Sequence, residues 1–198
     1  MLPVHTQKLT LASTSVYRQE LLSRLGLAFD TKPPGVNEDR LLGESPLALS
    51  RRLALAKAQC VFAQHPDRIV IGADQVLDVG GQALGKPGSI PAAIEQLRAL
   101  SGKVAYFHSA VTVIGPSGTL LAVETSIARF RQLDRRQIEH YVHIETPIDT
   151  AGSAKAEGLG IALLEELSSK DPTAIIGLPL ITLTRMLRLN GLDPLTHA

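Results

Sequence analysis

The chain has 198 residues, 44% of them hydrophobic, which is enough to bury a full core in one domain or in one domain with a lobe. A net charge of +1 excludes a broad basic surface for nucleic acid but allows a local cationic pocket. A single cysteine, Cys60, excludes an internal disulfide or a cysteine-based zinc site. With no membrane-length apolar run and no signal-peptide core at the N-terminus, we expect a cytoplasmic protein with no membrane contact.

The first half of the chain alternates strands with helices. Ser15 can cap one helix, and Ser45 followed by Pro46 marks the start of another, because proline suits the first helical position. In chain order we expect a strand at 8–12, a helix at 15–25, a strand at 28–32, a helix at 46–64 and a strand at 69–73, which 75–79 either continues or follows as a hairpin arm.

The second half contains one long antiparallel hairpin and further helices. Asp134 and Gln137 have the spacing of a capping box, which predicts a helix start. The expected elements are a helix at 91–100, strands at 104–114 and 120–130, a helix from 134 to about 143, a loop at 146–160, a strand at 161–164 and a last helix after Pro179 that ends at Asn190. This order predicts an α/β fold on a mixed sheet.

The segment 69–76 carries the strongest functional signal. An apolar, β-branched run ends on Asp74 and Gln75, and ligands gather where buried strands end. A carboxylate at such a place is costly if it faces the core and useful if it faces a cleft. The alternative interpretation is that Asp74 only opens a turn.

The glycine-rich segment 80–86 has the spacing of a P-loop but not its chemistry. Pro87 stands where a serine or threonine hydroxyl would hold Mg²⁺. Proline also lacks an N–H and disfavours a helical conformation at Lys86. We therefore exclude a P-loop and retain Lys86 as a point charge for a phosphate.

Other polar residues stand where they could meet an anionic ligand. Ser13 and Arg18 flank a strand-to-helix junction, whose free N–H groups attract anions. Glu38 lies in an acidic loop, Lys57 on a helix, and Glu157 beside Lys155 in the glycine-containing loop. Each also has a plain structural explanation, as a helix cap, a solvated charge or a tight loop.

The histidines show no catalytic pattern. His140 and His143 share a helix face at a spacing of three residues, which could bind a metal ion. We favour a surface helix, because no partner carboxylate motif accompanies them.

Together, these segments resemble the Maf family of nucleoside triphosphate pyrophosphatases. The matching pieces follow the family order: Leu11-Ala12-Ser13-Thr14-Ser15, Arg18, Glu20-Leu21-Leu22, Glu38, Ala56-Lys57-Ala58, Ile71-Gly72-Ala73-Asp74-Gln75-Val76, Gly85-Lys86-Pro87, Phe130-Arg131, Ala151-Gly152-Ser153 and Gly177-Leu178-Pro179-Leu180. Asp74-Gln75, the 151–158 segment and Asp171-Pro172 are similar to the branch that hydrolyses 7-methyl-GTP. The chain departs from the family at Val16, where proline is usual, and at Tyr17, where close relatives often carry tryptophan.

The resemblance implies a single Maf-like domain over residues 1–198. Its fold would be an elongated mixed α/β sheet flanked by helices, similar to inosine triphosphatases, with a substrate cleft between two lobes. It also implies a homodimer that acts on a nucleotide and contacts neither nucleic acid nor membrane.

The resemblance implies hydrolysis of a triphosphate to the monophosphate and pyrophosphate. Asp74 would accept a proton from the attacking water. A divalent cation (Mg²⁺, Mn²⁺ or Co²⁺) would be held by Glu38 and Asp74. The remaining site residues would bind the phosphates (Ser13, Arg18, Lys57 and Lys86) and select the base (Tyr17, Gln75 and Glu157).

Two alternatives stay open at this point. The first is a pyrophosphatase of the same family that acts on dTTP and UTP. The second is a nucleotide-binding regulator of cell division without significant turnover. Pyrophosphate release across a panel of triphosphates separates the three hypotheses.

Overall fold

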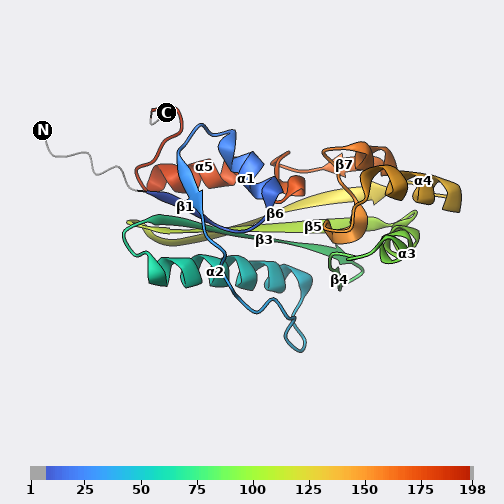
Figure 1. Cartoon of the computed structure of the whole chain (residues 1–198), viewed down its shortest axis with the longest axis horizontal. Helices are drawn as coiled ribbons and strands as arrows, with labels where there is room; N and C mark the ends of the chain where they lie inside the picture. The colour runs from blue at the N-terminus through green and yellow to red at the C-terminus, as the bar shows by residue number, and fades with distance from the viewer. Residues whose placement is uncertain (1–7, 197–198) are drawn as a thin grey trace, which may run out of the picture.

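The computed structural model of the chain describes residues 8–196 as a long twisted sheet with helices on both faces (Figure 1). The signal-peptide expectation rests partly on residues 1–7, which lie outside the described residues. Within residues 8–196, none of the helices has the length and apolar character that crossing a bilayer requires.

The sheet is mixed, as the sequence predicts. Its order is β2-β1-β3-β5-β6-β7, and β4 pairs with the end of β3. The strand β1 runs parallel to both of its neighbours, whereas the other pairs are antiparallel. The strands are β1 (Leu9–Ala12), β2 (Phe29–Thr31), β3 (Ile69–Val79), β4 (Gln82–Leu84), β5 (Val104–Gly115), β6 (Gly118–Phe130) and β7 (Leu164–Ser168).

Three helices begin at the caps that the sequence predicts. The Ser15 and Ser45 hydroxyls each accept a hydrogen bond from the main chain of the first turn, and Asp134 forms the full capping box with Gln137. The helices are α1 (Val16–Ser23), α2 (Pro46–Gln64), α3 (Ile90–Leu100), α4 (Arg135–Glu145) and α5 (Leu180–Leu189).

The predicted strand at 161–164 is wrong. This segment belongs to a 3₁₀ turn, Leu159–Leu163, and the strand β7 begins only at Leu164. The reason is the tight fold of the preceding loop around Gly160, where an added Cβ would lie 2.4 Å from the main-chain oxygen of Lys155. The chain must turn at this point before it can extend along β6.

The segment 80–86 forms the β3–β4 turn and the strand β4 rather than a P-loop. Gly80 and Gly81 both have positive φ, which a tight hairpin turn requires. The exclusion of a P-loop is therefore confirmed. The two alternatives for the segment 75–79 both hold, since it extends β3 to Val79 and also forms one arm of the hairpin with β4.

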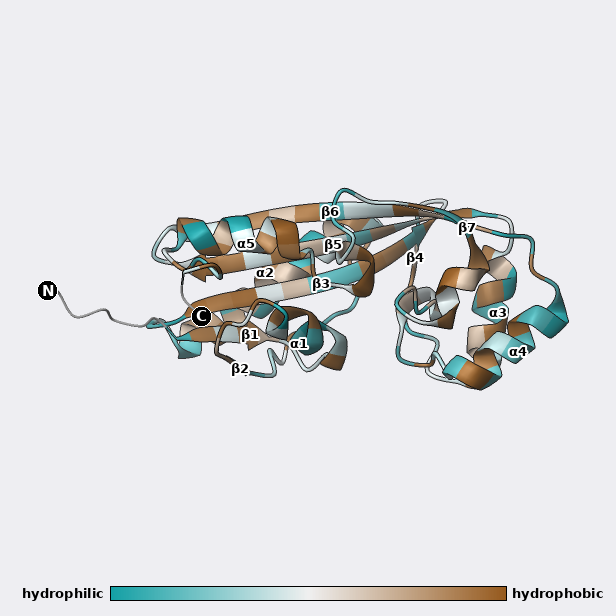
Figure 2. Cartoon of the chain, turned by 90° about the horizontal axis from the view of Figure 1, so that it is seen from above, coloured by the Kyte–Doolittle hydropathy of each residue, from teal (hydrophilic) through white to brown (hydrophobic). Residues whose placement is uncertain are grey.

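Helices cover the two faces of the sheet and its far end. On one face, α1 and α5 pack apolar side chains such as Leu22 and Leu187 against Leu11 and Ile71. On the opposite face, α2 packs on β1 and β3. At the far end, α3 and α4 enclose a second core around the rings of phenylalanines 107 and 130. Figure 2 shows α1, with β1 and β2, well separated along the sheet from α3 and α4.

One glycine sets how closely α2 approaches the sheet. A Cβ added to Gly72 on β3 would lie 2.3 Å from the main-chain oxygen of Ala54 and 2.8 Å from the Cβ of Ala58. Only glycine fits at such a distance. Residues 72 and 74 share a face of the strand, so this contact also brings the α2 side chains close to Asp74.

The sheet has a local gap beside β3. The pairing with β1 ends at Gly72, and the pairing with β4 begins at Leu77. Within residues 8–196, the stretch 73–76 therefore has a registered partner only on the β5 side. Asp74 and Gln75 both lie at this gap, which opens the middle of the sheet to a ligand.

We predict that Gly72→Ala lowers the free energy of unfolding by about 1–3 kcal/mol, since the added methyl group must push main chain apart. Urea unfolding checks this. Gly85→Ala is the control, because a Cβ there meets nothing within 4 Å and the φ angle is not strained. Equal stabilities of the two variants would contradict the close packing at Gly72.

Candidate active site

Every side chain that the sequence predicts as a site residue lines one cleft of about 650 Å³, located at the gap beside β3. Its walls come from α1, α2, the β4 hairpin and the 149–157 loop, so both ends of the sheet contribute to it. The predicted residues on these walls are Ser13, Tyr17, Arg18, Glu38, Lys57, Asp74, Gln75, Lys86 and Glu157. His140 and His143 are on α4 and are not part of this lining.

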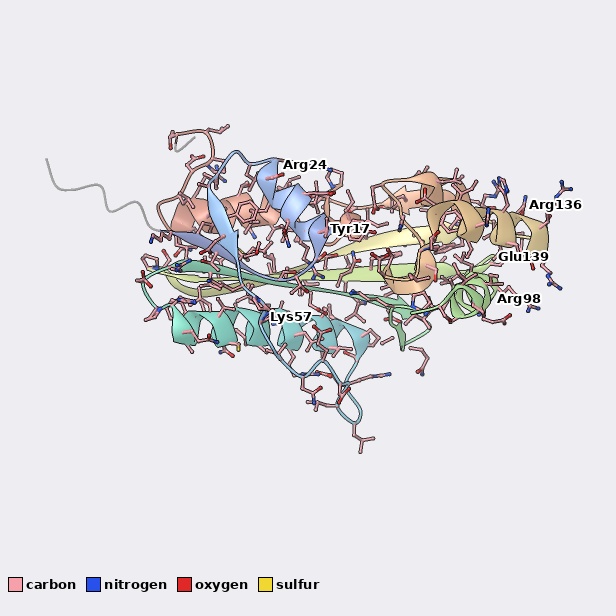
Figure 3. The ribbon with its side chains drawn as sticks, in the orientation of Figure 1. Tyr17, Arg24, Lys57, Arg98, Arg136 and Glu139 are labelled. Carbon is pink, nitrogen blue, oxygen red and sulfur yellow. The ribbon has the colours of Figure 1, made fainter. Side chains whose placement is uncertain are left out.

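The centre of the cleft is a lysine between two carboxylates. The Nζ of Lys57 lies 2.7 Å from Oδ1 of Asp74 and 2.6 Å from Oε1 of Glu38. Lys57 and Asp74 are buried, with side-chain exposures of 6% and 8%, while Glu38 is 59% exposed. Figure 3 shows Lys57 projecting from α2, on the other side of the sheet from Tyr17.

Burial dominates the ionisation of Asp74. Removal from water raises the pKa of its carboxyl group, and the positive charges of Lys57 and Arg18 oppose this shift without cancelling it. Asp74 therefore holds a proton more readily than an exposed aspartate does. A raised pKa brings a carboxylate closer to the value that suits a general base near neutral pH.

The pKa of Glu38 shifts in the opposite direction. Partial burial would raise it, but the hydrogen bond and charge of Lys57, together with the charges of Lys86 and Arg18, lower it overall. These cations approach Glu38 from separate elements, so they converge on one point of the cleft. Glu38 thus stays ionised and suits the binding of a cation.

The loop that carries Glu38 is anchored to α2. Arg52 donates from Nη2 to the main-chain oxygen of Asp39 at 2.8 Å and from Nε to Glu44 Oε1 at 2.7 Å. This ion pair lowers the pKa of Glu44 to about 2. Arg52 could not be found from the sequence, because nothing in it shows that a helical arginine reaches back to the preceding loop.

Arg18 is the positive group on the α1 side of the cleft. Its Nε donates to the main-chain oxygen of Gly177 at 3.0 Å. This bond uses Nε alone, so the two terminal nitrogens of the guanidinium do not take part in it. Burial lowers the pKa of Arg18, against the opposing charges of Asp74 and Glu38. Nearby, the Ser13 hydroxyl accepts from the Ser15 N–H at 3.1 Å, which shapes the turn into α1.

Gln75 is largely committed to the protein itself. Its Nε2 donates to the Ser109 hydroxyl at 2.9 Å and to the main-chain oxygens of Ala174 at 3.0 Å and Ile175 at 2.9 Å. Its side chain leaves β3 on the face opposite Asp74, because adjacent residues of a strand alternate. Gln75 therefore fixes the segment before Gly177, and only its Oε1 remains to meet a ligand.

The end of the cleft near the 149–157 loop is acidic. Glu157 is exposed at its mouth, and its pKa is raised first by partial burial and then by the neighbouring charges of Glu145 and Asp149. Lys155 opposes this shift, but its Nζ donates to the main-chain oxygen of Glu145 at 2.8 Å. Tyr17, on the facing wall, donates its hydroxyl to Asp149, a cleft residue that the sequence analysis missed.

The donors at the centre fit a hard divalent cation. Glu38 and Asp74 each contact Lys57 through one oxygen, so each keeps a second carboxylate oxygen. Mg²⁺ typically takes one or two carboxylates together with phosphate oxygens and waters. Within residues 8–196, no group of three or more histidine, cysteine, aspartate and glutamate side chains forms a complete protein cage for a metal.

Comparisons with known proteins give one matching family and several named relatives. A family model described as Maf-like protein matches residues 8–190. A protein of Bordetella pertussis named 7-methyl-GTP pyrophosphatase is 54% identical over 195 residues, which cover 98% of both chains. Proteins of the same name from Xanthomonas axonopodis pv. citri and Cupriavidus pinatubonensis are 52% and 51% identical, over 93% of this chain and 97% and 94% of theirs.

We predict that Asp74→Asn stabilises the fold at neutral pH by about 1 kcal/mol, because it removes a buried charge while Lys57 keeps Glu38 as its partner. Because the folded-state pKa of Asp74 is raised, ionisation costs stability as the pH rises above about 4, the ordinary aspartate value. The gain should therefore shrink as the pH falls from about 7 to about 4.

Urea unfolding across this pH range measures the effect. Asp67→Asn is the matched control, since it makes the same change at an exposed position outside the cleft. A loss of stability for Asp74→Asn at neutral pH would show that attraction to Lys57 outweighs the cost of burial.

Proposed function

The chain belongs to the Maf family, and we propose that it hydrolyses 7-methyl-GTP to 7-methyl-GMP and pyrophosphate. The observation that carries this proposal is the buried Lys57–Asp74 pair at the wall of a cleft that also contains the cations Arg18 and Lys86 and, on the 149–157 loop, the carboxylates Asp149 and Glu157. Such a cleft suits a ligand with a polyanionic tail and a positively charged head. The relatives named 7-methyl-GTP pyrophosphatase, which match over nearly their full length, support the same substrate.

The cationic end is the place for the triphosphate. Lys57 and Lys86 come from α2 and the β4 hairpin, and Arg18 comes from α1, so a phosphate chain would be held from three directions. An oligophosphate repels an incoming nucleophile until its charge is neutralised. Ser13 and the free N–H groups at the start of α1 would add hydrogen bonds.

Glu38 and Asp74 would hold the divalent cation with their remaining carboxylate oxygens. When bound, such a cation polarises the phosphate oxygens and makes bound water more acidic. Lys57 would then shift its contacts towards the phosphates, because its three N–H donors are a compact, rotatable set on a flexible stem.

Asp74 would act as the general base. As a carboxylate it takes a proton from a water molecule, whose oxygen forms a bond to the α-phosphorus while the bond to the β-phosphate oxygen breaks. Pyrophosphate leaves as one unit, with the electron pair of the broken bond. The proton on Asp74 then returns to solvent.

The acidic end would select the base. The ring of 7-methylguanine is positively charged, and such a ring favours an aromatic face and a nearby carboxylate. Tyr17 would supply the face, and Glu157 would accept hydrogen bonds from the N1 and exocyclic amino groups. Gln75 would contribute only as an acceptor through Oε1, since its Nε2 is already bonded.

Several expectations from the resemblance stay predictions. One sheet runs through the described residues, which supports a single domain with two lobes. The homodimer and the cytoplasmic location need light scattering of the purified protein and cell fractionation. The alternatives are a dTTP and UTP pyrophosphatase or a regulator without turnover. Among the residues that line the cleft, none favours either of them over 7-methyl-GTP hydrolysis.

We predict that pyrophosphate release is faster with 7-methyl-GTP than with GTP, dTTP or UTP, and that Asp74→Asn reduces it by about a hundredfold or more. A coupled assay for pyrophosphate measures both. Asp67→Asn should match the wild-type rate. Preference for dTTP or UTP would support the first alternative, and tight nucleotide binding without pyrophosphate release would support the regulator.

We also predict that EDTA stops the reaction and that added Mg²⁺, Mn²⁺ or Co²⁺ restores it, because the carboxylates at the centre match the preference of such ions. Glu38→Gln should raise the concentration of Mg²⁺ needed for half-maximal rate. Full activity in thoroughly metal-free buffer would contradict the role given to Glu38.

A further inference from the structure

Asp149 connects the two walls of the cleft. It lies in the loop between α4 and the 3₁₀ turn Ala151–Ser153, and it lines the cleft. The hydroxyl of Tyr17, on α1, donates to Asp149 Oδ2 at 3.3 Å and faces Oδ1 at 3.5 Å. Asp149, which is far from Tyr17 in the sequence, thus accepts a hydrogen bond from the only tyrosine among the residues that line this cleft.

The charged groups of the cleft come from different elements. The positive groups Arg18, Lys57 and Lys86 come from α1, α2 and the segment after β4, and Lys57 contacts the carboxylates of Glu38 and Asp74. The remaining carboxylates of the lining, Asp149 and Glu157, both come from the 149–157 loop, on the same side of the cleft.

The cation nearest to the acidic end does not remove its charge. The Nζ of Lys155 is directed at the C-terminus of α4, where it donates to the main-chain oxygen of Glu145. Tyr17 donates a neutral hydrogen bond to Asp149, which leaves the negative charge in place. Thr150 donates a second neutral hydrogen bond to Asp149, so within residues 8–196 this carboxylate accepts from hydroxyl groups and lies beyond the hydroxyl edge of the Tyr17 ring.

We propose that Asp149 is a second specificity-determining residue, which favours a cationic purine ring by placing a negative charge at the edge of Tyr17. This inference rests on the proposed function and adds a separate role at the same site. Glu157 would read the hydrogen-bond donors of guanine, which guanine and 7-methylguanine share. Asp149 would instead read the charge, which only the methylated ring carries. A carboxylate attracts such a ring and gives a neutral base no comparable gain.

The test measures binding of the reaction products, 7-methyl-GMP and GMP, by isothermal titration calorimetry of the whole protein. Asp149→Asn keeps an oxygen that accepts from Tyr17 but removes the charge. We expect it to weaken 7-methyl-GMP binding about five- to tenfold and to change GMP binding by less than about twofold. Asp67→Asn, the matched control, should change neither.

Three results would overturn the proposal. The first is an equal loss of affinity for both nucleotides in Asp149→Asn, which would make Asp149 a purely structural residue. The second is no loss of affinity for either nucleotide. The third is a wild-type protein that binds the two nucleotides with equal affinity. Because the measurement needs no turnover, it stays informative even if the chain releases no pyrophosphate. A failure of the proposed reaction is therefore distinguishable from a failure of the role given to Asp149.

Discussion

The contact between α2 and β3 at Gly72 is the constraint on which the site depends. The absence of a side chain lets the main chain of the helix lie against the strand, with Ala54 and Ala58 on either side. Lys57 directly precedes one of these alanines, and Asp74 is two residues beyond Gly72 on the same face of the strand. The 2.7 Å ion pair between them follows from this spacing. A larger residue at position 72 would separate the pair as well as weaken the core.

A buried ion pair of this kind gives little stability, and its position explains why it is present. The cost of burial exceeds the attraction of Lys57 and Arg18 at Asp74, as the raised pKa of this carboxyl group shows. The pair lies at the gap where β1 has ended and β4 has not begun, so a ligand can reach it. The buried charges therefore lower the stability of the fold at the same point where a charged nucleotide would bind.

The sequence predicted most elements, because their signals are local. The caps Ser15 and Ser45, the capping box at Asp134 and the turn of the long hairpin all act within a few residues. The predicted site residues all line one cleft. They could be predicted because they belong to motifs that follow the order of the family. The sequence could not predict contacts between distant segments. The bond between Tyr17 and Asp149 and the use of Gln75 to hold the segment 174–175 both depend on tertiary packing. The wrong strand at 161–164 has a different cause, since the apolar pattern does not show how tightly the main chain folds around Gly160.

The orientation of the triphosphate decides whether this account is correct. If the base lies against Tyr17 and the outer phosphates lie among Lys57, Lys86 and Arg18, Asp74 stands beside the innermost phosphorus. Hydrolysis in ¹⁸O-labelled water, followed by mass spectrometry of both products, measures where the water oxygen goes. The account predicts that the label enters 7-methyl-GMP and that pyrophosphate stays unlabelled. Label in pyrophosphate would mean that attack occurs at the β-phosphorus, and it would contradict the place given to Asp74.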